Sequence, residues 1–169
     1  MSWPTDRSRH GGIDEIPVNP LPGRLWLAGK HLVAPDPDAA LDLVGASAVM
    51  CLCQADELDR YPSYVPWLQA HLPGTAAWWP IGDLGVPTIE RAELLIGDLR
   101  ARLASGAGVV VHCGAGIGRA GTLAIALLLT NGVGLEEAMR IVAAARPMAG
   151  PQAGAQLVLL HELARRHPS

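Results

Sequence analysis

Three consecutive valines followed by a glycine-rich turn constrain the fold of this chain more than any other feature. The stretch from Val109 to Thr122 reads VVVHCGAGIGRAGT. β-Branched residues in a short apolar run favour a buried strand, and glycines allow the positive φ angles that a tight turn needs. In α/β proteins, ligand sites lie beyond the carboxyl ends of parallel strands. The turn after Val111 is therefore the first candidate for a functional site.

The rest of the chain alternates between strand-like and helix-like patterns. Further strands are predicted at 24–28, 48–53 and 75–79, and helices at 35–45, 61–72, 88–105, 119–130, 135–146 and 152–166. Strands separated by helices predict an α/β domain with a central, mostly parallel sheet flanked by helices. We expect residues 24–169 to form this single domain. Residues 1–23 contain four prolines, which favours an extended N-terminal arm.

The composition excludes several kinds of protein. The chain has 169 residues, of which 50% are hydrophobic and 17% charged, as suits a globular domain. The net charge is −3 and the cations, with Lys30 as the single lysine, do not cluster, so we expect neither a nucleic-acid nor a membrane partner. Three cysteines are too few for a disulfide framework and suit a reducing compartment. Because residues 1–12 contain no apolar signal-like segment, we expect a cytoplasmic protein.

The turn combines features that bind a phosphate group. Its glycines can direct backbone N–H groups inward, and the helix that follows adds the positive end of its dipole. Arg119 can donate two parallel N–H bonds to phosphate oxygens, and the surroundings favour the thiolate form of Cys113, a nucleophile that needs no metal or cofactor. His112 is expected to lie under the loop and fix its shape by hydrogen bonding. The candidate substrate-binding residues are Gly114, Ala115, Gly116, Ile117, Gly118 and Arg119.

The pattern His112-Cys113-x5-Arg119 resembles the signature of the protein tyrosine phosphatase superfamily, which includes the dual-specificity phosphatases. The longer string HCGAGIGRAGT is similar to the HCSAGIGRSGT form of the tyrosine-specific members. The resemblance implies a phosphotyrosine-phosphatase-like fold for the catalytic domain. It also implies a two-step hydrolysis of phosphomonoesters, in which the cysteine takes the phosphoryl group and water then releases it from the phosphocysteine.

A second segment, WPIGDLGVP from Trp79 to Pro87, resembles the mobile acid loop of the same superfamily, which reads WPDFGVP. The resemblance makes Asp83 the general acid that protonates the leaving group. Two residues, Ile81 and Gly82, intervene between the proline and the aspartate. The alternative is that Asp83 is an aspartate of an ordinary turn or helix cap.

The superfamily often places a glutamine after an Arg-Pro pair to orient the hydrolytic water. Here Arg146-Pro147 is followed by Gln152 and Gln156, and Gln156 fits the position somewhat better. The alternative is a glutamine on an exposed helix face.

The chain departs from the family at the hydroxyls that usually lie beside the thiolate. Ala120 follows the signature arginine and Gly114 follows the cysteine, so Thr122 is the nearest remaining hydroxyl. A lost hydrogen bond to a charged group costs about 1–3 kcal/mol, so we expect slow hydrolysis of the phosphocysteine. A catalytically weak phospho-ligand-binding protein is therefore the main alternative. A sulfurtransferase or an arsenate reductase is a third, disfavoured by the Asp83 loop and by His112.

The five residues of the turn are uncharged, which favours a phosphoprotein or a small phosphomonoester as substrate over polyphosphorylated lipids. The short chain favours a shallow, dual-specificity-like cleft. Aromatic residues that could line its rim, unless they serve the core, are Tyr61, Tyr64, Trp67, Trp78 and Trp79.

Two further cysteines, Cys51 and Cys53, lie on one predicted strand and share a face, so they cannot easily bond to each other. If that strand lies beside Val109–Val111, Cys53 could trap oxidised Cys113 as a disulfide. The alternative is that Cys53 is a small buried hydrophobic residue. A Cys53–Cys113 peptide in mass spectra of peroxide-treated protein is the test, and its consistent absence removes the hypothesis.

Overall fold

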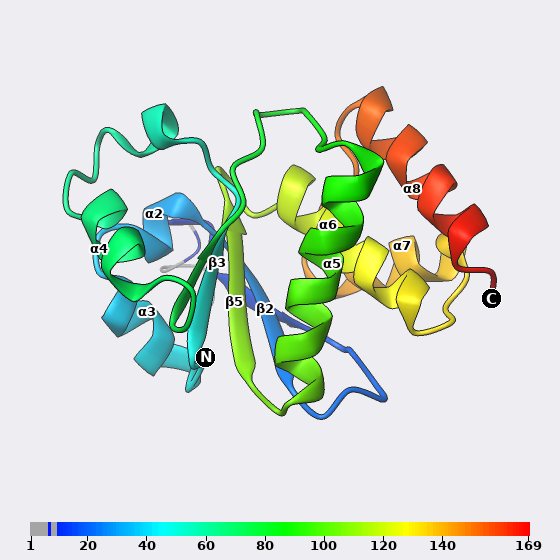
Figure 1. The fold of residues 1–169 in the computed structure, drawn as a ribbon, viewed down its shortest axis with the longest axis horizontal. Coiled ribbons are helices and arrows are strands. Elements are labelled where there is room, and N and C mark those ends of the chain that lie inside the picture. The colour runs from blue at the N-terminus through cyan, green and yellow to red at the C-terminus, as the bar shows by residue number, and fades with distance from the viewer. Residues whose placement is uncertain (1–6, 8–9) are drawn as a thin grey trace.

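The computed structural model describes Arg7 and residues 10–169; the remainder of the predicted N-terminal arm, residues 1–6 and 8–9, lies outside the described residues. A five-stranded sheet with strand order β1-β2-β5-β3-β4 forms the centre (Figure 1). The strands are β1 (Ile13–Ile16), β2 (Arg24–Gly29), β3 (Ala48–Cys51), β4 (Ala76–Trp78) and β5 (Gly108–Cys113). β1 is antiparallel to β2 and the other pairs are parallel, which confirms the predicted mostly parallel sheet.

Helices cover both faces of the sheet (Figure 1). On one face lie α2 (Lys30–Val33), α3 (Pro37–Val44) and α4 (Tyr64–His71), and on the other lie α5 (Ile89–Ala104), α6 (Gly118–Thr130), α7 (Leu135–Ala145) and α8 (Gly154–Arg166). A 3₁₀ helix, η1 (Ala55–Leu58), follows β3. Within the described part of the chain, no helix has the length and apolar character needed to cross a bilayer.

The central strand β5 is buried on both faces, which explains its run of valines. Val109 and Val111 pack in the core formed with α5 to α8, whereas Val110 packs in the core formed with α2 to α4. Strands between two helical layers read as continuous apolar runs because alternate side chains meet different cores. The strand then ends at Cys113, at the carboxyl edge of the parallel strands.

Within the described part of residues 1–23, the chain adds a strand to the sheet, which the prediction of an extended arm did not include. Ile13–Ile16 forms an edge strand, with Ile13 paired to Ala28 and Ile16 paired to Leu25. The segment is short and lies between glycines and prolines, so its local pattern did not identify it as a strand. Its position is decided by the unpaired edge of β2, which it covers.

The helix predicted at 61–72 starts later, at Tyr64, because of its prolines. Pro66 is the third residue of α4, where a backbone N–H has no partner within the helix. Proline is therefore tolerated there, whereas Pro62 lies before the helix.

Gly121 brings α6 into close contact with the segment after α7. A Cβ atom at this position would lie 2.3 Å from the backbone nitrogen of Gly150. The helix is apolar around its whole circumference and almost fully buried, so it has little freedom to move away.

We expect Gly121→Ala to lower the free energy of unfolding by about 1–3 kcal/mol, because overpacking strains a core that cannot rearrange. Urea unfolding of the purified variant measures this. The matched control is Gly97→Ala on the exposed face of α5, where a Cβ meets nothing within 4 Å. Alanine favours a helix over glycine by about 1 kcal/mol, so the control should be neutral or stabilising. Equal stability of the two variants would contradict the close contact at Gly121.

Candidate active site

The turn between β5 and α6, which we call the phosphate loop (113–119), forms one wall of a hollow of about 320 Å³ that we call the catalytic hollow. The residues lining it are Lys30, Glu57, Asp83, Leu84, Cys113, Gly114, Ala115, Gly118, Arg119 and Gln152. The structure thus brings together Cys113, Arg119 and Asp83, the three catalytic candidates of the sequence. They come from a strand end, a helix start and a separate loop.

The phosphate loop is held from behind by Arg146, the residue after α7. Its guanidinium donates from Nε to the Gly116 carbonyl and from Nη2 to the Ala115 carbonyl, each at 2.8 Å, and from Nη1 to Asp14 at 2.8 Å. Gly116 has φ of 74°, and a Cβ there would lie 2.3 Å from the Ala28 carbonyl oxygen. The sequence marked this arginine only through its proline neighbour, so its support of the loop was missed.

His112 lies beneath the loop and is fully buried. Its Nδ1 donates to the Cys113 carbonyl at 3.2 Å, and its Nε2 forms a hydrogen bond with the Tyr64 hydroxyl at 2.6 Å. Burial raises the pKa of Tyr64, so the hydroxyl stays a donor. Tyr64 is therefore part of the support for the loop and not of a substrate rim.

Arg119 is held by a carboxylate that the sequence did not reveal. Its Nη1 and Nη2 donate to the two oxygens of Glu57 at 2.8 and 2.7 Å, and Nη1 also donates to the Ile81 carbonyl at 2.7 Å. Asp83 lies 3.4 Å from Nη2. The pair with Glu57 occupies the Nη edge of the guanidinium, which leaves the Nε side for a bound anion.

The pairing also sets the charge of both groups. Burial alone would lower the pKa of Arg119, but hydrogen bonds to Glu57 and the negative charge of Cys113 outweigh it and raise the pKa. Burial would raise the pKa of Glu57, but the hydrogen bonds from Arg119 and from the Gln54 backbone lower it. Both groups are therefore charged at neutral pH.

Glu57 lies in η1, where it also accepts from the backbone N–H of Gln54 at 2.8 Å. The only sequence signal for it was this local capping pattern. The partner Arg119 is 62 residues away, so spacing could not identify it.

Asp83 lies on the loop between β4 and α5 and is 73% exposed at its side chain. The structure explains the two residues, Ile81 and Gly82, that this loop has in addition to the WPD pattern. Ile81 is buried, its N–H donates to the Leu52 carbonyl at 2.9 Å, and its own carbonyl accepts from Arg119. The insertion therefore fixes the base of the loop against the site, while Asp83 extends into the catalytic hollow.

Gln152 lines the catalytic hollow and Gln156 does not, which reverses the preference drawn from the sequence. Gln152 lies against Gly118, where a Cβ would come within 2.3 Å of the glutamine Oε1. Gln156 is buried; its Oε1 accepts from the Gln152 backbone N–H at 2.7 Å, and its Nε2 donates to the Gly85 carbonyl at 3.4 Å. Gln152 precedes α8, whereas Gln156 lies in the first turn of this helix. Gln152 therefore reaches the phosphate loop, and Gln156 holds the backbone of Gln152.

Among the described residues, no hydroxyl is seen to take the place of the one missing at Ala120. Thr122 is buried and its Oγ1 has no hydrogen-bond partner among the described residues. It lines a separate apolar cavity of about 30 Å³ with Ile81 and Val86. Thr122, the nearest remaining hydroxyl in the sequence, therefore makes no hydrogen bond to Cys113 in this structure.

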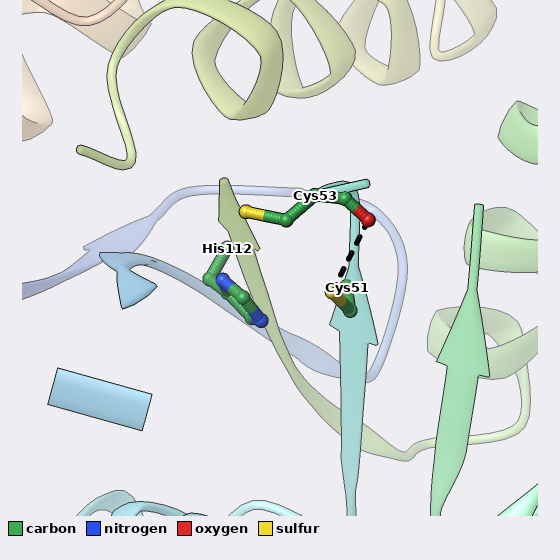
Figure 2. A group of neighbouring side chains, drawn as sticks. All are labelled: Cys51, Cys53 and His112. Atoms are coloured by element: carbon green, nitrogen blue, oxygen red, sulfur yellow. Dashed lines mark hydrogen bonds between the residues drawn. The ribbon is translucent and has the colours of Figure 1, made fainter. Parts of the chain in front are cut away.

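Cys51 and Cys53 lie next to His112, under the phosphate loop (Figure 2). The side-chain ligand atoms of all three residues lie within 4.8 Å of one another, and all three are buried. A hydrogen bond from Cys51 and burial raise the pKa of the Cys53 thiol. Because β3 pairs with β5, the condition for the disulfide hypothesis is met, and the hypothesis stays a prediction.

Comparison with known proteins identifies the family and the fold of the chain. Residues 26–166 match the family model PTP-SAK, the DSP-PTPase phosphatase domain of Swiss Army Knife proteins. The uncharacterized protein MJECL20 of Methanocaldococcus jannaschii is 34% identical over 77 residues, which are 46% of each chain, so the chain spans about half the length of this relative.

Solved structures agree in fold over nearly the whole chain. The active form of Tk-PTP has a TM-score of 0.68 at 26% identity, covering 97% of this chain and 99% of that one. Kinase associated phosphatase, with its catalytic cysteine replaced by serine, has a TM-score of 0.76 at 22% identity, covering 94% and 96%. Since this family model matches residues 26–166, the chain belongs to the PTP-SAK family of DSP-PTPase phosphatase domains.

Proposed function

We propose that this phosphatase hydrolyses phosphomonoesters through a phosphocysteine formed on Cys113. The observation that carries the proposal is that Cys113, Arg119 and Asp83 line one hollow at the carboxyl end of β5. A nucleophile, an anion clamp and an acid on a separate loop are the groups that this reaction needs.

In the first step the Cys113 thiolate attacks phosphorus and forms the P–S bond. The bond from phosphorus to the leaving oxygen breaks, and Asp83, as the carboxylic acid, gives that oxygen its proton. Arg119 and the loop N–H groups bind the phosphate oxygens, whose charge is redistributed in the transition state.

In the second step water attacks the phosphorus of the phosphocysteine. Asp83, now a carboxylate, takes the water proton, the P–S bond breaks, and Cys113 leaves as a thiolate. We assign the positioning of the water to Gln152, because its side chain lies against Gly118 of the phosphate loop and lines the catalytic hollow. Gln156 then acts on Gln152, as a positioning residue.

The substrates that we propose are phosphorylated proteins or small phosphomonoesters. The proposed compartment is the cytoplasm, because a thiolate nucleophile needs reducing conditions and all three cysteines are free. The second candidate function is a protein that binds phosphorylated ligands with little turnover, and the absence of a hydroxyl at Ala120 favours it.

Hydrolysis of para-nitrophenyl phosphate tests the proposal. We expect activity in the wild type, none in Cys113→Ser, and a loss of about 10²–10⁴ in kcat in Asp83→Asn, because general acid catalysis contributes that much. Asp42→Asn, an exposed aspartate on α3, is the matched control and should keep full activity. Full activity in Cys113→Ser would refute the phosphocysteine; tight phosphopeptide binding by an inactive wild type would favour the second candidate.

Ala120 makes the second step slow in our account. Rapid mixing with para-nitrophenyl phosphate should therefore show a burst of one nitrophenol per enzyme followed by slow turnover. In Ala120→Ser the added hydroxyl should raise the steady-state rate by about 5–160-fold, the equivalent of about 1–3 kcal/mol, and reduce the burst. Ala120→Cys, similar in size with a weaker donor, should change the rate less. An unchanged rate in the serine variant would show that the hydroxyl is not what limits turnover.

Glu57→Gln tests the carboxylate that holds Arg119. We expect a loss of about 1–2 kcal/mol in unfolding free energy at pH 7, since the pair keeps part of its solvent contact. The pKa of Glu57 is lowered in the folded state, so its stabilisation is present above the ordinary value of 4.5 and is lost as pH falls through the lower folded value. Urea midpoints of the wild type and variant should therefore differ at pH 7 and converge on acidification. A pH-independent difference would contradict the ion pair.

A further inference from the structure

Two cysteines and a histidine form a buried cluster beneath the phosphate loop (Figure 2). Cys51 ends β3 and pairs in register with His112 of β5, and Cys53 follows two residues later. Both cysteines pack in the core formed with α2 to α4, whereas Leu52 between them packs in the opposite core. The alternation of the extended chain therefore turns both thiols to one face, where the His112 ring also lies.

The distances within the cluster suit a metal ion. One ligand atom from each residue, two sulfurs and a ring nitrogen, lies within 4.8 Å of the other two. Zinc bonds of about 2.3 Å to sulfur and about 2.0–2.1 Å to nitrogen place tetrahedral ligand atoms about 3.5–3.8 Å apart. Side-chain movements of about 1 Å therefore bring all three atoms to bonding distance of one ion, while the strands stay paired.

The present partners of the two thiols are weak. The Cys51 sulfur lies 3.9 Å from the Cys53 carbonyl oxygen, and a thiol is a poor hydrogen-bond donor. The hydrogen bonds of the Cys53 thiol are to Cys51 and His112, which belong to the same cluster. Both cysteines are fully buried, so water does not compete for their sulfurs. A metal ion that takes the two sulfurs therefore replaces only weak contacts.

Tyr64 supplies an oxygen beside the cluster, since its hydroxyl forms a hydrogen bond of 2.6 Å with His112 Nε2. Structural zinc sites have four ligands, and this hydroxyl is the candidate for the fourth. An ion that binds a ring nitrogen of His112 replaces the hydrogen bond of that nitrogen, to Tyr64 or to the Cys113 carbonyl. His112 thus connects the cluster to the phosphate loop.

The charge and the softness of the ligands select the ion. A thiol that binds a metal ion gives up its proton, so the two cysteines contribute two negative charges. Zn²⁺ balances these charges, whereas Cu⁺ would leave a net negative charge in a fully buried place, which is costly. Mg²⁺ and Ca²⁺ prefer oxygen ligands, while sulfur and imidazole are typical ligands of zinc.

We propose that Cys51, Cys53 and His112 bind one Zn²⁺ ion beneath the phosphate loop. The two sulfurs and one ring nitrogen form bonds to the ion, the two thiol protons pass to solvent, and no oxidant or reductant is consumed. None of the three residues lines the catalytic hollow, so the ion takes no part in the reaction at Cys113. Because the ion joins β3 to β5, it stabilises the folded chain.

Titration of the reduced, chelator-treated full chain with Zn²⁺, in competition with a chromophoric chelator, tests the site. We expect one Zn²⁺ per chain in the wild type, and unchanged affinity in Cys113→Ser, which lacks the catalytic thiol. Cys51→Ala and Cys53→Ala should each weaken binding by about 100-fold or more, since even the partners of metal ligands contribute about 10–100-fold. Alanine leaves no polar group buried without a partner.

Two further measurements separate loss of the site from loss of the fold. Each variant is first melted in chelator, where a single cooperative transition shows that it is folded. Zn²⁺ should then raise the melting temperature of the wild type and of Cys113→Ser, and not that of Cys51→Ala. Cobalt in place of zinc needs no substitution in the cluster: Co²⁺-loaded Cys113→Ser should show sulfur-to-cobalt charge-transfer absorption and the visible bands of tetrahedral coordination.

Zinc binding that is lost in Cys113→Ser and kept in both alanine variants would place the metal in the catalytic hollow and overturn the inference. A cobalt spectrum of Cys113→Ser without sulfur bands would overturn it as well. So would a wild type that leaves all zinc with a chelator of about micromolar affinity, since structural zinc sites bind far more tightly. None of these measurements uses phosphatase activity, so their failure leaves the proposed function intact.

Discussion

The buried guanidinium of Arg146 is the interaction on which the site depends most. It joins the phosphate loop, through the carbonyls of Ala115 and Gly116, to Asp14 in the edge strand β1. A buried arginine is tolerated only when its charge is paired and its N–H groups are satisfied. The loop can therefore take its shape only when α7 and β1 are in place. Because Arg146 binds these carbonyls on one side of the loop, the backbone N–H groups of the loop can point to the opposite side.

A comparable arrangement holds the clamp. One edge of the Arg119 guanidinium is paired with Glu57, and the side chain is almost fully buried. Water therefore does not have to rearrange around the guanidinium when a ligand binds. Groups that are oriented before the substrate arrives stabilise a transition state most effectively. The acid loop is tied to the same guanidinium through the Ile81 carbonyl, so the positions of clamp and acid are coupled.

The backbone of the phosphate loop has two sides, and each lines a hollow. One hollow is lined by Cys113 and Arg119, and the other by Arg7, His10, His31 and Arg146, with no carboxylate among its described lining residues.

Much of the fold and the centre of the site could be predicted from the sequence because the signals are local. The valine run and the glycine spacing determine β5, the phosphate loop and the start of α6 within about twenty residues, and the apolar periodicities indicate most of the other helices. Asp83 could also be identified as a site residue, since the sequence of its loop, Trp79–Pro87, forms one contiguous pattern. The edge strand β1 was missed because its four residues gain their order from pairing with β2, not from their own pattern.

The chain by itself identified the candidates for the nucleophile, the clamp and the acid, together with the α/β architecture that joins them. Only the tertiary structure decided which groups surround them: Glu57 on Arg119, Arg146 and Asp14 behind the loop, Gln152 in the hollow in place of Gln156, and Thr122 without a hydrogen bond to Cys113. The physical reason is the same in each case. The reactive groups of this loop lie within one short stretch of sequence, so a local pattern identifies them. The residues that support the loop by hydrogen bonds and ion pairs are far apart in the sequence, as with Arg146 and Asp14, which are separated by 132 residues. No local spacing reveals such pairs.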